Sequence, residues 1–423
     1  MVDDVVKRLL FSPSFLHTFK RVSNNHGLHF PLKFPSVLAE LNFLSVLCLL
    51  NFASGYRVPL HEQTGRGAWD NIRALAFGMY LSSATGQGDL LTAKGMRTIK
   101  PQQIAELMSI KIYVERSHET LPGVTVGELG GPMYDLAKLI STTLNETGEI
   151  LERSGLPDLG SFVLRSLTSK RSGGRDVTVD DILNDVGPSP LTLDEPRSTT
   201  FCSSCALSLH FGTWQLWTVD VSFSSWSPDV VLNVSRLETA VYCFKKALFL
   251  IHGMTLRFGS SSPPPFPLPD TTKVPVFTDN VLPSLLIHLG VLDLSGAKNV
   301  ALRSIFPDAA NDTNVNTLLA VPKDTLAIGT AVAPGTKLKT APLKEGPVLS
   351  PDQAYILRAA AVDACEKIVE YAHQLDETSL SDDQRWIKDI TLPELDVWLW
   401  AVAKDRSDYR DLERFVLCNT VFF

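Results

Sequence analysis

Apolar residues recur at helical spacing along much of the chain, and this pattern restricts the fold more than any other feature. Residues 134–154 and 236–256 both carry apolar side chains every three or four positions, and Gly155 follows the first segment as a C-terminal stop. Ser350, Pro351 and Gln353 form a capping box with a proline in the first turn, and we expect that helix to reach about residue 374. No stretch shows the regularly spaced short strands of a sandwich or barrel. The sequence therefore predicts a mainly α fold.

The length of the chain, 423 residues, is enough for one large core or two moderate ones. We expect one large helical domain over residues 1–423. Three segments have the composition of surface insertions, at 166–233, 260–270 and 309–346. Within the first of them, residues 199–233 combine aromatic and Ser residues without a clear period, and their role stays open.

The formal net charge of -7 argues against a general nucleic-acid binder, because such proteins neutralise phosphates with a surplus of Lys and Arg. Six dispersed cysteines suit a reducing compartment. The acidic start, Met1-Val2-Asp3-Asp4, lacks the basic residues of a secretion signal. The apolar run 38–52 contains polar residues and is shorter than the roughly 20 residues of a membrane span. We expect a soluble, cytoplasmic protein that acts on a small molecule, with no membrane or nucleic-acid partner.

Two sequence patterns resemble parts of metal sites, and both are incomplete. Cys202 and Cys205, with His210 downstream, lack the second close pair that a structural zinc site needs. His61-Glu62 begins like a zinc-protease helix but lacks the second histidine, and the glycines beside it predict a loop. No serine elbow or cysteine–histidine pair indicates acyl transfer. The sequence therefore predicts no metal site.

Six separated patches occur in an order that matches a known family. They are His29 with Leu50-Asn51-Phe52; Gly67-x-Trp69; Leu144-Asn145-Glu146-Thr147-Gly148; Phe244-Lys245-Lys246-Ala247; Phe277-Thr278-Asp279-Asn280-Val281-Leu282-Pro283 with His288-Leu289-Gly290; and Leu395-Asp396-x-x-Leu399-Trp400 with the closing Val421-Phe422-Phe423. Together they resemble the queuosine salvage proteins, which are queuosine 5'-phosphate N-glycosylase/hydrolases. The resemblance covers about residues 29–423, apart from the insertions.

The resemblance implies an all-helical fold related in shape to the helical DNA glycosylases. It also implies hydrolysis of queuosine 5'-phosphate to queuine and ribose 5-phosphate, a step in queuine salvage for the queuosine modification of tRNA. No metal or redox cofactor is expected for this reaction.

Cleavage of an N-glycosidic bond passes through a ribosyl cation, which a nearby carboxylate stabilises or traps. Asp279 is the candidate catalytic residue, because it occupies the aspartate of the family's Phe-x-Asp motif. Without the resemblance, Asp279 would be interpreted as the N-cap of a helix beginning near Pro283. Phe277 is expected to stack on the 7-deazaguanine base of the substrate.

Three further residues are expected to bind substrate. Asp396 is the candidate carboxylate for the base or for the cyclopentenediol of queuine, and the alternative is a solvated Asp in the first turn of the last helix. Lys245 is expected to pair with the 5'-phosphate, and the alternative is a solvated lysine beside Lys246. His29 matches a histidine of the family that contacts substrate. Asn51 and Glu146 are expected to fix local structure.

Two positions depart from the C-terminal signature of the family: Val397 replaces an aromatic residue, and Ala401 replaces a second aspartate. These departures leave open an alternative function, in which a relative of the family binds queuine or a related base without cleaving a nucleotide. A nucleic-acid glycosylase is a third possibility that rests on analogy of fold alone. The acidic charge balance argues against it.

Overall fold

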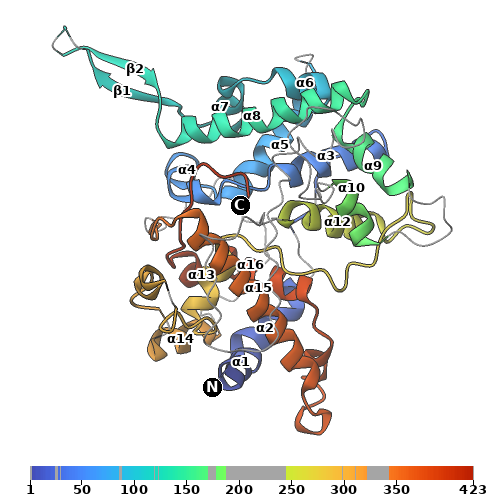
Figure 1. Ribbon diagram of the computed structural model, residues 1–423, viewed down its shortest axis with the longest axis vertical. Helices are drawn as coiled ribbons and strands as arrows, with labels where there is room; N and C mark the ends of the chain where they lie inside the picture. The colour runs from blue at the N-terminus through green and yellow to red at the C-terminus, as the bar shows by residue number, and fades with distance from the viewer. Residues whose placement is uncertain are drawn as a thin grey trace, which may run out of the picture. The chain divides into compact units, whose positions relative to one another are not determined.

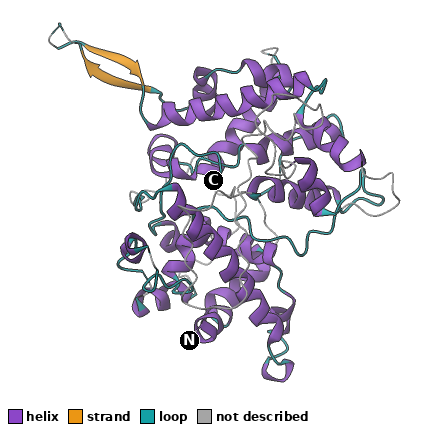
Figure 2. Ribbon diagram, viewed as in Figure 1, coloured by secondary structure: helices purple, strands orange, loops and turns teal. Residues whose placement is uncertain are grey.

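The computed structural model is mostly helical, and its described residues contain one two-stranded sheet, so the prediction of a mainly α fold is confirmed (Figures 1 and 2). The structure describes residues 2–23, 27–28, 30–84, 88–118, 120–121, 123–169, 178–186, 244–297, 299–309, 311–321 and 343–422. The segments 199–233 and 236–243 and the Cys202–Cys205 pattern lie outside these residues.

The chain divides into two compact units. Among the described residues, unit 1 takes the parts of Met1–Phe30 and Thr272–Leu417, while unit 2 takes those of Pro31–Val219, Thr239–Thr271 and Cys418–Phe423. The expectation of a single domain over residues 1–423 stays a prediction.

Unit 1 is helical in its described residues. Its elements are α1 (Val2–Leu10), α2 (Pro13–Val22), α13 (Val281–His288), η4 (Val300–Ser304), α14 (Asp312–Leu319), α15 (Pro351–Gln374), η5 (Glu377–Ser379), η6 (Arg385–Asp389), α16 (Leu392–Asp405) and α17 (Ser407–Arg410). The long helix α15 begins as the sequence predicts. The Ser350 side chain accepts from the Gln353 backbone N–H, and the Gln353 side chain accepts from the Ser350 N–H at 3.0 Å.

The core of unit 1 forms where α2, α13, α15 and α16 bury their apolar faces. Trp398 of α16 is fully buried, and its ring lies edge-on to Phe15 of α2 with centroids 4.8 Å apart. Its indole N–H donates to the Thr18 hydroxyl at 2.8 Å, so the polar atom of this buried ring is satisfied. In Figure 1, α13, α15 and α16 pack against one another.

Unit 2 contains the remaining elements of the described residues. They are α3 (Val37–Leu49), η1 (Ser54–Tyr56), α4 (Arg57–Thr64), α5 (Ala68–Ala84), α6 (Ala93–Thr98), α7 (Pro101–Met108), β1 (Tyr113–Ser117), β2 (Thr125–Leu129), α8 (Pro132–Arg153), α9 (Leu159–Ser169), α10 (Val179–Val186) and α12 (Lys245–Phe258). The apolar run 38–52 forms the buried helix α3, as predicted. Asn42 joins this helix to its surroundings, donating to Leu91 O at 3.0 Å and accepting from Gly160 N at 3.1 Å.

The predicted helix at 134–154 is α8, and Gly155 follows it with φ 66°, the left-handed conformation that favours glycine after a helix. The segment predicted at 236–256 is helical from Lys245 in its described part. One sequence interpretation was wrong: His61-Glu62 lies in α4 and not in a loop. Helix α14 lies inside the expected insertion 309–346, and that insertion stays a prediction. The antiparallel hairpin β1–β2 was not predicted. Figure 2 shows this hairpin extending away from the helices of unit 2.

No single helix in the described ranges is long and apolar enough to cross a membrane, although the bent pair Val37–Leu49 and Ser54–Thr64 passes the same test of length and composition.

Candidate functional site

The candidate site in unit 1 is the turn at residues 276–280, which leads into α13. Val276, Phe277, Thr278 and Asn280 are all buried, whereas Asp279 is partly exposed. Asp279 is therefore the one residue of this turn that is not fully buried. The turn carries two of the residues that the sequence selects, Phe277 and Asp279.

Side chains from distant parts of the chain hold this turn. Asp396 of α16 accepts from the Phe277 backbone N–H at 2.9 Å. Arg358 of α15 donates to the Thr278 carbonyl through Nε at 3.1 Å and Nη2 at 2.9 Å. The backbone groups immediately before Asp279 are thus bonded to two charged side chains, and such bonds are stronger than those between neutral groups.

The backbone after Asp279 is held as well. Asn280 donates to the Phe415 carbonyl at 2.8 Å, and the Asp279 carboxylate accepts from the Val281 N–H at 2.7 Å. Helix α13 has Asn280 as its N-cap residue, without a side-chain cap bond from it. The structural alternative for Asp279 therefore needs one correction: the helix begins at Val281, near Pro283 as that alternative had it, but its N-cap is Asn280, and Asp279 stands one residue before it.

Asp396 is buried in the second turn of α16, with 7% of its surface exposed. The alternative of a solvated aspartate in the first turn of a helix was therefore wrong. Helix α16 is also not the last helix, because α17 follows it. Its bond to Phe277 gives Asp396 a role in holding the turn. Burial, and secondly the charge of Asp396, raise the pKa of the Cys365 thiol of α15 well above its usual value, so this thiol stays protonated. The expected contact of Asp396 with substrate stays a prediction.

Lys245 and Lys246 begin α12 in unit 2, and both are buried, with 6% and 3% of their surfaces exposed. The alternative of a solvated Lys245 beside Lys246 was therefore wrong, and its expected pairing with the 5'-phosphate stays a prediction. Lys245 donates to the Asn51 carbonyl at 3.2 Å, and Lys246 donates to the Leu49 carbonyl at 2.9 Å. Carbonyls at the C-terminal end of a helix carry partial negative charge, so the end of α3 stabilises these ammonium groups. Asn51 thus fixes local structure, as expected.

The remaining predicted positions are placed as follows. His29 lies outside the described residues. Phe277, Asp279 and Asp396 belong to unit 1, whereas Lys245 belongs to unit 2. The structure brings Phe277 and Asp396 into direct contact. Within the described ranges, no group of three or more His, Cys, Asp or Glu side chains is arranged to hold a metal ion.

Sequence reasoning missed Arg358 and Asn280 as contributors to the turn. Arg358 is one of several charged residues in the long helix α15, and no local pattern distinguishes it from a surface arginine. Its burial arises from contact with residues 80 positions away. Asn280 lies inside the patch Phe277–Pro283. Its position between Asp279 and the apolar start of a helix could have identified it.

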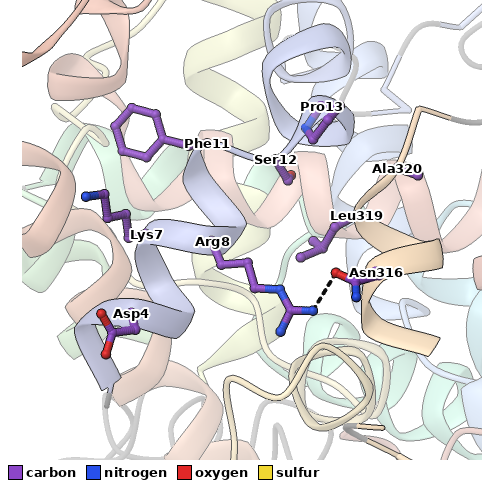
Figure 3. A pocket seen from close by; sticks show the side chains of 9 residues that line it. All are labelled: Asp4, Lys7, Arg8, Phe11, Ser12, Pro13, Asn316, Leu319 and Ala320. Carbon is purple, nitrogen blue, oxygen red and sulfur yellow. Dashed lines mark hydrogen bonds between the residues drawn. The ribbon is translucent and has the colours of Figure 1, made fainter. Parts of the chain in front are cut away.

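A pocket of about 570 Å³ lies elsewhere in unit 1. It is formed by α1, the start of α2 and α14, and Figure 3 shows Arg8 at its wall, bonded to Asn316 at 2.6 Å. Arg8 also pairs with Asp312 at 3.1 Å, which offsets its charge. None of the predicted site residues lines this pocket. The pocket therefore lends no support to the predicted chemistry.

Comparison with known proteins gives no family model that matches the chain and no curated protein that matches it.

Proposed function

We propose that this chain hydrolyses the N-glycosidic bond of queuosine 5'-phosphate and releases queuine and ribose 5-phosphate. The observation that carries the proposal is the partly exposed residue Asp279, on a turn whose other residues are buried and held by Asp396 and Arg358. A carboxylate held in a fixed place suits a reaction with a cationic transition state.

The reaction breaks the bond between ribose C1' and the glycosidic nitrogen of the base. Water supplies the oxygen that bonds to C1', and a proton passes to the departing nitrogen. Positive charge develops on the ribose ring as the bond breaks, and the Asp279 carboxylate stabilises or traps this cation. The backbone bonds around Asp279 keep the carboxylate in place, so it does not have to reorganise during the reaction.

The other parts of the proposal rest on the family resemblance. Phe277 stacks on the base, Asp396 contacts the base or its diol, Lys245 pairs with the 5'-phosphate, and His29 contacts substrate. The relation in shape to the helical DNA glycosylases belongs to the same proposal. The small nucleotide substrate is consistent with a net charge of -7, which opposes binding to polymeric nucleic acid.

The test is incubation of the full chain with queuosine 5'-phosphate, followed by mass spectrometry of free queuine and ribose 5-phosphate. Asp279→Asn removes the negative charge and keeps an oxygen that accepts from the Val281 N–H. We expect this variant to lose at least about 100-fold in kcat. Asp293→Asn is the matched control, because Asp293 accepts from the Ser295 N–H in an exposed turn of the same unit. Equal turnover by wild type and Asp279→Asn would contradict the assignment of Asp279.

A second function, binding of queuine or a related deazaguanine without cleavage, is favoured by the surroundings of two residues. Val397 and Ala401 are buried in α16, with 5% and 4% of their surfaces exposed, and Ala401 belongs to the apolar core of unit 1. This chain therefore has no carboxylate at the position where the family carries its second aspartate. Tight binding of queuine, with no release from any deazaguanine nucleotide, would select this function over hydrolysis.

A further inference from the structure

The bonds to the turn at residues 276–280 differ in what they hold. Asp396 fixes the Phe277 N–H, which belongs to the peptide unit between Val276 and Phe277. Arg358 fixes the Thr278 carbonyl, which belongs to the peptide unit that ends at the Asp279 nitrogen. A rotation of that peptide unit would turn the Asp279 Cα–Cβ bond, so the Arg358 contact acts directly on the direction of the carboxylate.

The chemistry of arginine suits this contact. Two guanidinium nitrogens reach the same oxygen, at 3.1 Å and 2.9 Å, so the bonds restrict both the position and the plane of the peptide. Arg358 has 9% of its surface exposed. Hydrogen bonds from a charged donor are stronger than those between neutral groups, so this contact holds the carbonyl firmly.

We infer that Arg358 is a positioning residue that sets the direction of the Asp279 carboxylate through the Thr278 carbonyl. This inference rests on the proposed function, in which Asp279 acts on the substrate. Arg358 itself does not touch the reacting atoms in this account. Its loss should therefore reduce the rate of the chemical step more than the binding of substrate, since a misplacement of about 1 Å costs about 100-fold in rate.

The test compares Arg358→Met and Arg358→Lys with wild type by steady-state kinetics on queuosine 5'-phosphate, for protein shown to be folded by circular dichroism. For Arg358→Met we expect kcat to fall by about 10- to 100-fold and KM to change by less than about 3-fold. Arg358→Lys should recover part of kcat, because an ammonium group can donate one of the two bonds. A purely structural role would lower stability and leave the kcat of the folded protein unchanged.

Arg303→Met is the matched control. Arg303 also donates to a backbone carbonyl, that of Ala297 at 2.6 Å, but it is exposed and lies away from the turn. We expect wild-type kinetics from this variant. A wild-type kcat in folded Arg358→Met, or a rise in KM at unchanged kcat, would overturn the inference about Arg358. The proposed function would still stand if the wild type turned over substrate and Asp279→Asn were inactive.

Hydrogen exchange separates the inference from the proposed reaction. In Arg358→Met, the peptide that covers residues 276–282 should exchange its amide protons faster than in wild type, with the rest of α13 and α16 little changed. This measurement needs no turnover. If the wild type releases no queuine, the proposed reaction is wrong. Unchanged exchange in this peptide would then overturn the positioning role of Arg358 as well. Faster exchange would show that Arg358 still positions the turn, in a protein with a different reaction.

Discussion

His252 is a buried base whose proton binding should connect the stability of unit 2 to pH. It lies on α12 with 8% of its surface exposed, and its Nδ1 lies 2.9 Å from the Thr271 hydroxyl. Burial lowers the pKa of His252 to about 4 in the folded protein, whereas an exposed histidine has a pKa near 6.5. Between these two pH values the unfolded chain binds a proton that the folded chain does not bind.

The sign of the effect follows from that difference. The contribution of His252 to stability is fully present above about pH 6.5 and is lost as the pH falls toward 4, because protons favour the unfolded chain. The two pKa values correspond to roughly 3 kcal/mol. We expect His252→Gln to lose less free energy of unfolding than wild type between pH 7 and pH 4.5, as measured by urea titration. His17→Gln, at an exposed histidine, is the control, and the same pH dependence in all three proteins would contradict this prediction.

At the residue scale, the sequence predicted that Phe277, Asp279 and Asp396 bind substrate. The structure brings Phe277 and Asp396 into contact. The sequence did not indicate which groups bond, because the bonds join residues 119 positions apart. The alternative of a solvated Lys245 was wrong for a similar reason. Lysines are normally solvated, and only the packing of α12 beside the end of α3 supplies the carbonyls that hold them inside.

At the scale of elements, the patch Leu144-Asn145-Glu146-Thr147-Gly148 joins α8 to α6. Asn145 donates to the Met96 carbonyl at 2.8 Å and to the Ile99 carbonyl at 3.0 Å, so it satisfies carbonyls at the end of α6. Gly148 allows the two helices to approach closely. A Cβ at this position would lie 2.4 Å from the Ala93 carbonyl oxygen and 2.5 Å from the Arg97 nitrogen.

Gly148→Ala should therefore destabilise unit 2. Both atoms that a methyl group would meet belong to the backbone, so the helices must move apart, at a cost of about 1–3 kcal/mol. Without this contact, a change from Gly to Ala inside a helix would raise the free energy of unfolding by about 1 kcal/mol. The sign of the effect therefore shows whether the close approach of α8 and α6 restricts this position. Thermal unfolding gives the measurement, with Thr142→Ala at an exposed position of α8 as control. A Gly148→Ala protein as stable as wild type would show that the helices separate at little cost.

Helix starts were predicted well where side chains signal them locally. Ser350 with Gln353 marks the start of α15 by hydrogen bonds within one turn. The hairpin β1–β2 was missed because all its strand residues are exposed and no buried face produces an alternating pattern. Helix α4 was missed because the glycines at 65 and 67 were interpreted as part of a loop. Gly65 instead ends the helix as its C-cap, with φ 69°.

At the scale of the whole molecule, the division into two units follows no simple order along the chain. Unit 1 combines Met1–Phe30 with Thr272–Leu417, and the last residues, Cys418–Phe423, belong to unit 2. Periodicity identifies the helices but carries no information on which helices share a core. That assignment depends on contacts between distant segments, such as the bond between Trp398 and Thr18, 380 positions apart.

The C-terminal tail is bonded to η1 of unit 2 through Tyr56. The Tyr56 hydroxyl donates to the Asn419 side-chain oxygen at 3.0 Å and accepts from the Asn419 backbone N–H at 3.2 Å. Beside this pair, the Cys418 thiol donates to the Gly55 carbonyl at 3.4 Å. Tyr56 has 3% of its surface exposed, and burial raises the pKa of its phenol, so the hydroxyl keeps its proton. One side chain thus holds both the backbone and the side chain of Asn419.

Tyr56→Phe should release the tail and leave the rest of unit 2 folded. The phenyl ring keeps the apolar packing, while the loss of two hydrogen bonds costs about 1–3 kcal/mol. We expect the amide protons of residues 418–422 to exchange faster with solvent, as measured by mass spectrometry of the C-terminal peptide. Tyr80→Phe is the matched control, since its hydroxyl donates to the Lys33 carbonyl at 2.7 Å elsewhere in unit 2 and should leave the tail unchanged. If Tyr56→Phe exchanged at the wild-type rate, contacts other than the Tyr56 hydroxyl would have to hold the tail, and Cys418 with Gly55 would be the next pair to change.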